Sequence, residues 1–203
     1  MSLAQNNKII LASASPRRFE LLQQIGVHAL VTPVNIEEVL MPGERPLDFV
    51  QRLALEKARA GFELMADEEI ELPVLGSDTI VELEGEVFGK PADSEQAREM
   101  LAKLSAKVHN VHTAILIKTA EAEYSALSSS QVEFTALSDK QIRAYVATGE
   151  PMDKAGSYGI QGRAAQFIKR LNGSYSGVMG LPLFETAELL AKVRVNILVH
   201  DDE

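Results

Sequence analysis

Short apolar runs alternate along this chain with stretches in which apolar residues recur at helical spacing. A continuous apolar run of a few residues is typical of a buried strand, and a longer periodic stretch is typical of an amphipathic helix. The pattern predicts strands at residues 8–13, 29–34, 74–81, 87–88, 108–118, 125–134 and 166–171. It predicts helices at residues 16–25, 46–65, 94–104, 138–149 and from residue 182 onward.

Capping residues mark where several of these helices begin and end. Ser15 precedes Pro16, which is the order of an N-cap followed by proline at the first helical position. Gly26 is placed to end the same helix. Ser138 and Gln141 have the spacing of a capping box.

Strands and helices interleave along the chain, and this order predicts an α/β protein with a mixed central sheet flanked by helices. The glycine-rich segments at residues 151–162 and 172–180 are expected to be loops. The apolar tail at residues 193–199 is expected to form an edge strand or part of a dimer contact. No linker separates independent units, so residues 1–203 are predicted to form a single domain.

Composition limits the chemistry open to this chain. Its 29 acidic and 20 basic residues give a formal net charge of -9, so the overall field repels nucleic acid polymers. The absence of cysteine excludes disulfides and thiolate metal sites and fits a reducing cytoplasm, which is the expected location. No apolar run approaches the length of a bilayer span, and the N-terminus lacks the order of a signal peptide, so no membrane association is expected.

Two adjacent arginines occupy the first turn of the first predicted helix. Cations at this end of a helix dipole are disfavoured by up to about 1 kcal/mol each, so Arg17 and Arg18 require an explanation. An anion above the helix N-terminus provides one, because free backbone N–H groups and the hydroxyls of Ser13 and Ser15 would bind it together with the arginines. The alternative is that both arginines are solvated at a surface helix start.

Two other charged residues fall where the pattern predicts the interior. Lys57 lies within the apolar arc of the 46–65 helix, and Asp78 lies inside the apolar strand 74–81. Lys57 either extends outward to solvent or lines a cleft and meets a phosphate. An unpaired buried charge is costly, so Asp78 either serves a cation, a metal ion or a water molecule, or caps a turn at the end of its strand.

A further lysine and a glycine-rich segment add to this set, whereas several familiar sites are absent. Lys90 lies in a constrained Gly-Lys-Pro loop, and the glycines of residues 154–162 allow backbone to approach a ligand closely. Neither a Walker-type phosphate loop nor a dinucleotide-binding fingerprint occurs in the sequence. His109 and His112 are three residues apart in a predicted strand and face opposite sides, which makes them a poor metal pair.

Taken together, these motifs occur in the order found in one enzyme family. They are SASPRR at residues 13–18, Glu37–Glu38, EKA at 56–58, GSDT at 76–79, GKP at 89–91, KAGSYGIQG at 154–162 and GLPL at 180–183. Over nearly its whole length the chain closely resembles the Maf-like nucleoside triphosphate pyrophosphatases. The resemblance implies a fold similar to that of the inosine triphosphate pyrophosphatases, with two lobes around a long central sheet and the substrate in the cleft between them.

Three positions narrow the resemblance to one branch of that family. Enzymes of the 7-methyl-GTP branch typically carry tryptophan after Ser-Pro and glutamine after Ser-Asp, where this chain has Arg17 and Thr79. With Gln161 in the third motif, the chain resembles the dTTP/UTP branch. A glutamine amide both donates and accepts, which suits the O4 and N3–H edge of uracil or thymine.

The resemblance implies hydrolysis of dTTP and UTP, and of modified pyrimidine nucleotides as a further substrate class, to the monophosphate and diphosphate. In this interpretation Asp78 accepts a proton from the attacking water, and Lys57 and Lys90 act beside it. A divalent cation, Mg²⁺ or Mn²⁺, is expected on Glu38 and Asp78, because a cation on a triphosphate needs only one or two protein carboxylates. The residues expected to bind the substrate are Ser13, Ser15, Arg17, Arg18, Thr79 and Gln161.

The same basic cleft also suits other functions. A nucleotide-binding regulator of cell division or septum formation would bind a nucleoside triphosphate with little turnover, and a phosphatase would release orthophosphate. Detection of diphosphate after incubation with UTP and Mn²⁺ separates these alternatives. The family resemblance also favours a homodimer.

Overall fold

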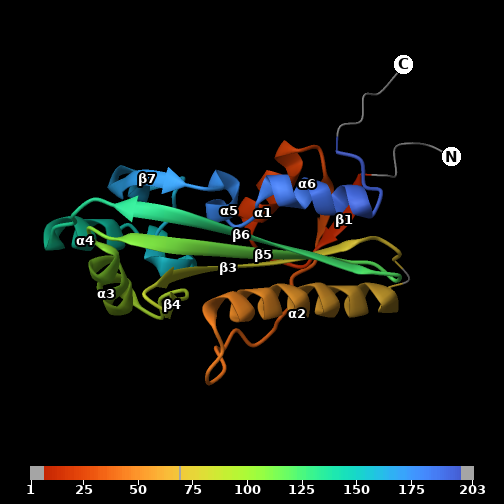
Figure 1. The fold of residues 1–203 in the computed structure, drawn as a ribbon, viewed down its shortest axis with the longest axis horizontal. Coiled ribbons are helices and arrows are strands. Elements are labelled where there is room, and N and C mark those ends of the chain that lie inside the picture. Colours follow the sequence, from red (N-terminus) through yellow and green to blue (C-terminus); the bar gives the residue numbers. More distant parts are fainter. Residues whose placement is uncertain (1–6, 69, 198–203) are drawn as a thin grey trace, which may run out of the picture.

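A single mixed β-sheet runs along the molecule in the computed structural model, which describes residues 7–68 and 70–197 (Figure 1). The strands are β1 (Lys8–Leu11), β2 (His28–Val31), β3 (Val74–Leu83), β4 (Glu86–Phe88), β5 (Val108–Lys118), β6 (Glu123–Phe134) and β7 (Ile168–Asn172). The helices are α1 (Pro16–Gln24), α2 (Pro46–Asp67), α3 (Ser94–Leu104), α4 (Asp139–Val146), α5 (Tyr175–Met179) and α6 (Leu183–Lys192). None of these helices combines the length and apolar character needed to cross a bilayer.

The strands follow the order β2-β1-β3-β5-β6-β7, and β4 is added to β3. β1 pairs in parallel with β2 and β3, whereas every other pairing is antiparallel. Helix α2 lies along one face of the sheet, and α1, α5 and α6 lie on the other (Figure 1). The prediction of an α/β fold with a mixed sheet flanked by helices is therefore confirmed.

The edge of β3 that faces away from β5 has a gap. β1 pairs with it only at Val74 and Leu75, and β4 pairs with it only from Val81 to Leu83. Residues 76–80 therefore have no strand partner on this side, although β5 pairs with all of them on the other. A break of this kind leaves the middle of a buried strand open to a ligand.

Close packing of α2 on β3 depends on Gly76. A Cβ atom at this position would lie 2.3 Å from the carbonyl oxygen of Ala54 and 2.5 Å from the backbone nitrogen of Ala58. Such contacts are far inside van der Waals distance, so only glycine allows the helix backbone to approach the strand this closely. The approach places Lys57, which lies between these two alanines, directly against β3.

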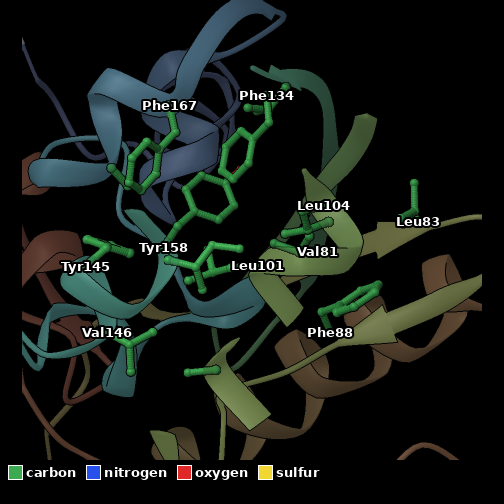
Figure 2. Close-up of a cluster of buried hydrophobic side chains, with 14 of the residues drawn as sticks. Val81, Leu83, Phe88, Leu101, Leu104, Phe134, Tyr145, Val146, Tyr158 and Phe167 are labelled. Atoms are coloured by element: carbon green, nitrogen blue, oxygen red, sulfur yellow. The ribbon is translucent and has the colours of Figure 1, made fainter. Parts of the chain in front are cut away.

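Two apolar clusters pack at opposite ends of the sheet. One joins α3 and α4 to the far ends of β3, β5 and β6, and Figure 2 shows its aromatic members Phe88, Phe134, Tyr145, Tyr158 and Phe167. The other joins α1 and α6 to β1 and to the opposite ends of β3 and β5. The middle of the sheet is covered by α2 through a smaller cluster.

Some segments differ from the sequence predictions. Residues 151–162, expected to be a loop, include two short 3₁₀ turns, and the second expected loop contains helix α5. The Ser174 hydroxyl accepts a hydrogen bond from Gly177 N and so caps this helical turn, which glycine content alone does not indicate. Residues 193–197 form no strand, and Val195 packs in the cluster of α1 and α6 instead of pairing at the sheet edge; residues 198 and 199 lie outside the described part of the chain.

Candidate active site

A cavity of about 930 Å³ lies at the gap in the β3 edge. Residues from α1, α2, β3 and the segment 150–162 line it, so it lies between the two ends of the sheet. All ten residues singled out in the sequence meet there: Ser13, Ser15, Arg17, Arg18, Glu38, Lys57, Asp78, Thr79, Lys90 and Gln161.

Lys57 forms ion pairs with two carboxylates at the floor of the cavity. Its Nζ atom lies 2.6 Å from Asp78 Oδ1 and 2.5 Å from Glu38 Oε1. The side chains of Lys57 and Asp78 are only 10% and 8% exposed, whereas that of Glu38 is 42% exposed. Lys57 therefore does not extend to solvent, and Asp78 lies in the middle of its strand rather than capping a turn.

Burial and neighbouring charges act in opposite directions on these two carboxyl groups. Burial raises the pKa of Asp78 above its ordinary value, and the positive charges of Lys57 and Arg18 offset only part of this rise. Burial also disfavours the ionised form of Glu38, but the hydrogen bond and charge of Lys57 hold its pKa below the ordinary value. Asp78 is thus a buried carboxylate with a raised pKa, and Glu38 is a more exposed carboxylate with a lowered pKa.

Arg18 is held rigidly by three protein groups. Its Nε donates to the Gly180 carbonyl at 2.8 Å, and its two terminal nitrogens donate to Ser13 Oγ at 3.1 Å and Thr79 Oγ1 at 3.3 Å. A guanidinium carries five N–H donors, so two remain for a ligand in the cavity. Burial lowers the pKa of Arg18, and the charge of Asp78 opposes that shift.

The N-terminus of α1 opens onto the cavity beside Arg18. Ser15 is the N-cap residue, but its side chain accepts no capping hydrogen bond. Its backbone nitrogen instead donates to Ser13 Oγ at 3.2 Å. The first turn of α1 therefore keeps its backbone donors available for an anion, as the two adjacent arginines indicate.

The wall opposite α1 contributes charged residues to which the sequence interpretation gave no role. Asp153 accepts a hydrogen bond from Arg17 at 3.2 Å, and its other oxygen lies 2.5 Å from Lys154 Nζ. Lys154 also donates to the Glu150 carbonyl at 2.7 Å. An acidic residue directly before the lysine of the glycine-rich motif is the only local signal of this pairing.

Lys90 and Gln161 line the cavity with exposed side chains. Neither side chain has an ion-pair or hydrogen-bond partner within residues 7–68 and 70–197. Both are therefore free to contact a bound molecule. By contrast, His109 and His112 take part in separate contacts, with Tyr158 and Ser129 respectively.

Glu38 and Asp78 provide a donor set that suits a divalent cation already bound by phosphates. Each carboxylate uses one oxygen for Lys57, and the second oxygen forms no ion pair with the described residues. The described part of the chain has no group of three or more His, Asp or Glu residues that would hold a metal ion alone. Mg²⁺ commonly binds through one or two carboxylates together with substrate phosphates, so the residues present fit such an ion.

Comparisons with known proteins agree with this geometry. A family profile described as Maf-like protein matches residues 8–193. A dTTP/UTP pyrophosphatase of Alkalilimnicola ehrlichii is 52% identical over 95% of this chain and 96% of its own. A dTTP/UTP pyrophosphatase of Aromatoleum aromaticum is 49% identical over 90% and 94% of the two chains. A nucleoside triphosphate pyrophosphatase of Haemophilus ducreyi is 44% identical over 95% and 98%.

These similarities extend over nearly the full length of each protein and include the segments that form the cavity. The chain belongs to the Maf-like protein family.

Proposed function

We propose that this protein hydrolyses dTTP and UTP between the α- and β-phosphates, releasing the nucleoside monophosphate and inorganic diphosphate. The proposal is carried by one observation: the candidate cations and a buried carboxylate, far apart in sequence, line a single cavity. The names of the relatives from Alkalilimnicola ehrlichii and Aromatoleum aromaticum support the same substrates.

Four cationic side chains bind the triphosphate in this proposal. Arg17 and Arg18 lie at the α1 end of the cavity, Lys57 lies at its floor, and Lys90 lies in the loop after β4. Neutralising the phosphate charge and positioning the phosphates is the main contribution that a protein makes to phosphoryl chemistry. The overall acidity of the chain is compatible with this role because the cations are concentrated locally.

Asp78 acts as the proton acceptor for water. The water oxygen forms a bond to the α-phosphorus, the bond from this phosphorus to the bridging oxygen breaks, and diphosphate leaves. The proton lost by the water passes to Asp78. Its raised pKa makes it a stronger base than an ordinary aspartate, while Lys57 at 2.6 Å favours the ionised form before the reaction.

A divalent cation and a glutamine complete the proposed site. Glu38 and Asp78 are the residues that would hold Mg²⁺ or Mn²⁺, and the ion would offset charge on the triphosphate. At the other end, the exposed amide of Gln161 is suited to pair with the O4 and N3–H groups of a uracil or thymine ring. Thr79 and Arg17 lie along the same cavity and limit the shape of the bound nucleotide.

The Asp78→Asn variant tests the assigned role of the carboxylate. Asparagine preserves shape but cannot accept the proton, so kcat for UTP and dTTP with Mn²⁺ should fall by about 10²- to 10⁴-fold, with little change in KM. Asp139→Asn is the matched control, because Asp139 is exposed at the start of α4. Turnover by a folded Asp78→Asn protein at the rate of the control would contradict the proposal, and tight UTP binding without turnover by the wild type would instead indicate a nucleotide sensor.

A further inference from the structure

We propose that Tyr145 and Glu150 are positioning residues that hold Gln161 at the base end of the cavity, and so contribute to nucleotide selectivity without touching the substrate's reacting atoms. The inference rests on the proposed function, because it concerns how the Gln161 amide is presented to a pyrimidine ring.

A continuous chain of hydrogen bonds ties the backbone on both sides of Gln161 to these two side chains. Gly159 N donates to the Tyr145 hydroxyl at 3.3 Å, and this hydroxyl donates to Glu150 Oε1 at 2.9 Å. Arg163 N donates to the other carboxylate oxygen, Glu150 Oε2, at 3.0 Å. The anchored amides belong to residues two positions before and two positions after Gln161.

The glycine next to Gln161 allows the carboxylate to approach. A Cβ atom at Gly162 would lie 2.1 Å from Glu150 Oε1 and 2.7 Å from Oε2, so no other residue fits there without displacing the carboxylate. The segment thus packs directly against the Glu150 side chain as well as bonding to it.

Tyr145 is itself rigidly packed. Its ring is buried and meets the Phe167 ring edge to face, with centroids 5.3 Å apart. Both residues belong to the apolar cluster drawn in Figure 2. Burial and the neighbouring carboxylate of Glu150 raise the pKa of Tyr145, so its hydroxyl stays protonated and donates. Tyr145 therefore connects the apolar cluster of α3 and α4 to Glu150 in the cavity wall.

The Gln161 side chain has no such anchor of its own. It is exposed on the cavity wall, and within the described residues it forms no hydrogen bond. Tyr145 and Glu150 therefore hold its backbone, and the amide reaches the ligand from that fixed starting point. Holding the backbone of a recognition residue in place before the ligand arrives leaves only the side chain to be ordered on binding, which lowers the entropic cost.

The test compares kcat/KM for UTP with that for CTP, which carries an amino group in place of O4. Tyr145→Phe and Glu150→Ala each remove two hydrogen bonds of the anchor, and each should lower the UTP/CTP ratio about 3- to 10-fold, while kcat at saturating UTP changes less than about twofold. Glu150→Gln keeps one of the two acceptor oxygens of the anchor and should therefore retain part of the ratio that Glu150→Ala loses. Tyr124→Phe is the matched control, because Tyr124 lies on β6 outside the cavity lining.

A double-mutant cycle separates positioning from general structural support. In the Gln161→Ala background, Tyr145→Phe should leave the UTP/CTP ratio unchanged, because the group that it positions is gone. An unchanged ratio in folded Tyr145→Phe and Glu150→Ala proteins, or an equal loss with and without Gln161, would overturn the positioning role and leave the proposed function intact. A wild-type enzyme with no preference for UTP over CTP would overturn the discrimination of uracil from cytosine on which the inference depends. Circular dichroism establishes that each variant is folded. Tyr145→Phe tests the bond to Gly159 N, and Glu150→Ala tests the bond to Arg163 N.

Discussion

Replacement of Lys57 by methionine tests whether the buried ion pairs are needed for both stability and activity. Methionine nearly preserves the volume of the aliphatic stem but removes the charge that faces Asp78 at 2.6 Å. Breaking a buried pair by removing one partner costs about 3–5 kcal/mol, because the other charge is left uncompensated. The lower end of that range applies here, since Asp78 borders a cavity that admits water.

The expected loss in stability is therefore about 3 kcal/mol, which corresponds to a fall of roughly 6–12 °C in Tm for a chain of this size. Without Lys57, nothing at that position opposes the rise in the pKa of Asp78 caused by burial. A carboxyl group whose pKa is higher in the folded than in the unfolded state binds more protons when folded. The deficit should thus be largest above the folded-state pKa and shrink as the pH falls through it towards the unfolded value.

Urea denaturation at several pH values and steady-state hydrolysis of UTP measure the two effects. Lys103→Met is the matched control: Lys103 pairs with Glu86 at the surface, where both side chains are about half exposed, and its loss should cost less than about 1 kcal/mol. The Lys57→Met variant should also lose about 10²- to 10³-fold in kcat/KM. The reasoning would be refuted if Lys57→Met were as stable and as active as Lys103→Met. It would also be refuted if Lys57→Met lowered the stability of the Asp78→Asn protein as much as it lowers that of the wild type.

Two further predictions concern stability. Gly76→Ala should destabilise the fold by about 1–3 kcal/mol in urea denaturation, because its Cβ would lie 2.3 Å from the α2 backbone. Gly89→Ala is the control and should be close to neutral, because a Cβ there would have nothing within 4 Å. Equal effects of the two substitutions would contradict the close packing of α2 on β3. Burial lowers the pKa of His109 from 6.5 to about 4, so only the unfolded chain takes up this proton as the pH falls between those values. This residue alone should therefore lower the free energy of unfolding of the wild type by about 2 kcal/mol between pH 7.5 and pH 5. The free energy of unfolding of His109→Gln should fall about 2 kcal/mol less over the same range. Identical pH profiles of stability for the two proteins would contradict this prediction.

Local patterns in the sequence predict the element order and several helix ends. Asp93 accepts hydrogen bonds from Glu95 N and Gln96 N at the start of α3, and Ser138 with Gln141 forms the expected capping box. These features depend on residues within one helical turn, which is why they are readable without tertiary structure. Buried positions that carry charge, such as Lys57 and Asp78, are readable for a similar reason, since they break an apolar pattern.

Contacts between distant segments are not readable in this way. The meeting of Lys57 with both Glu38 and Asp78 depends on how closely α2 packs on β3, and Gly76 of β3 permits this close packing. Glu150 likewise lies in an ordinary polar segment, and its contact with Arg163 N arises only when the chain folds back on itself. Helix α5 was missed because its capping residue, Ser174, is surrounded by glycines that favour a loop.

The most direct measurement is to identify the products formed from UTP and dTTP by the wild-type protein with Mn²⁺. Anion-exchange chromatography together with ³¹P NMR separates nucleoside mono- and diphosphates, orthophosphate and diphosphate. The expected products are the nucleoside monophosphate and inorganic diphosphate in equal amounts. Release of orthophosphate with a nucleoside diphosphate, or nucleotide binding with no product, would contradict the central claim.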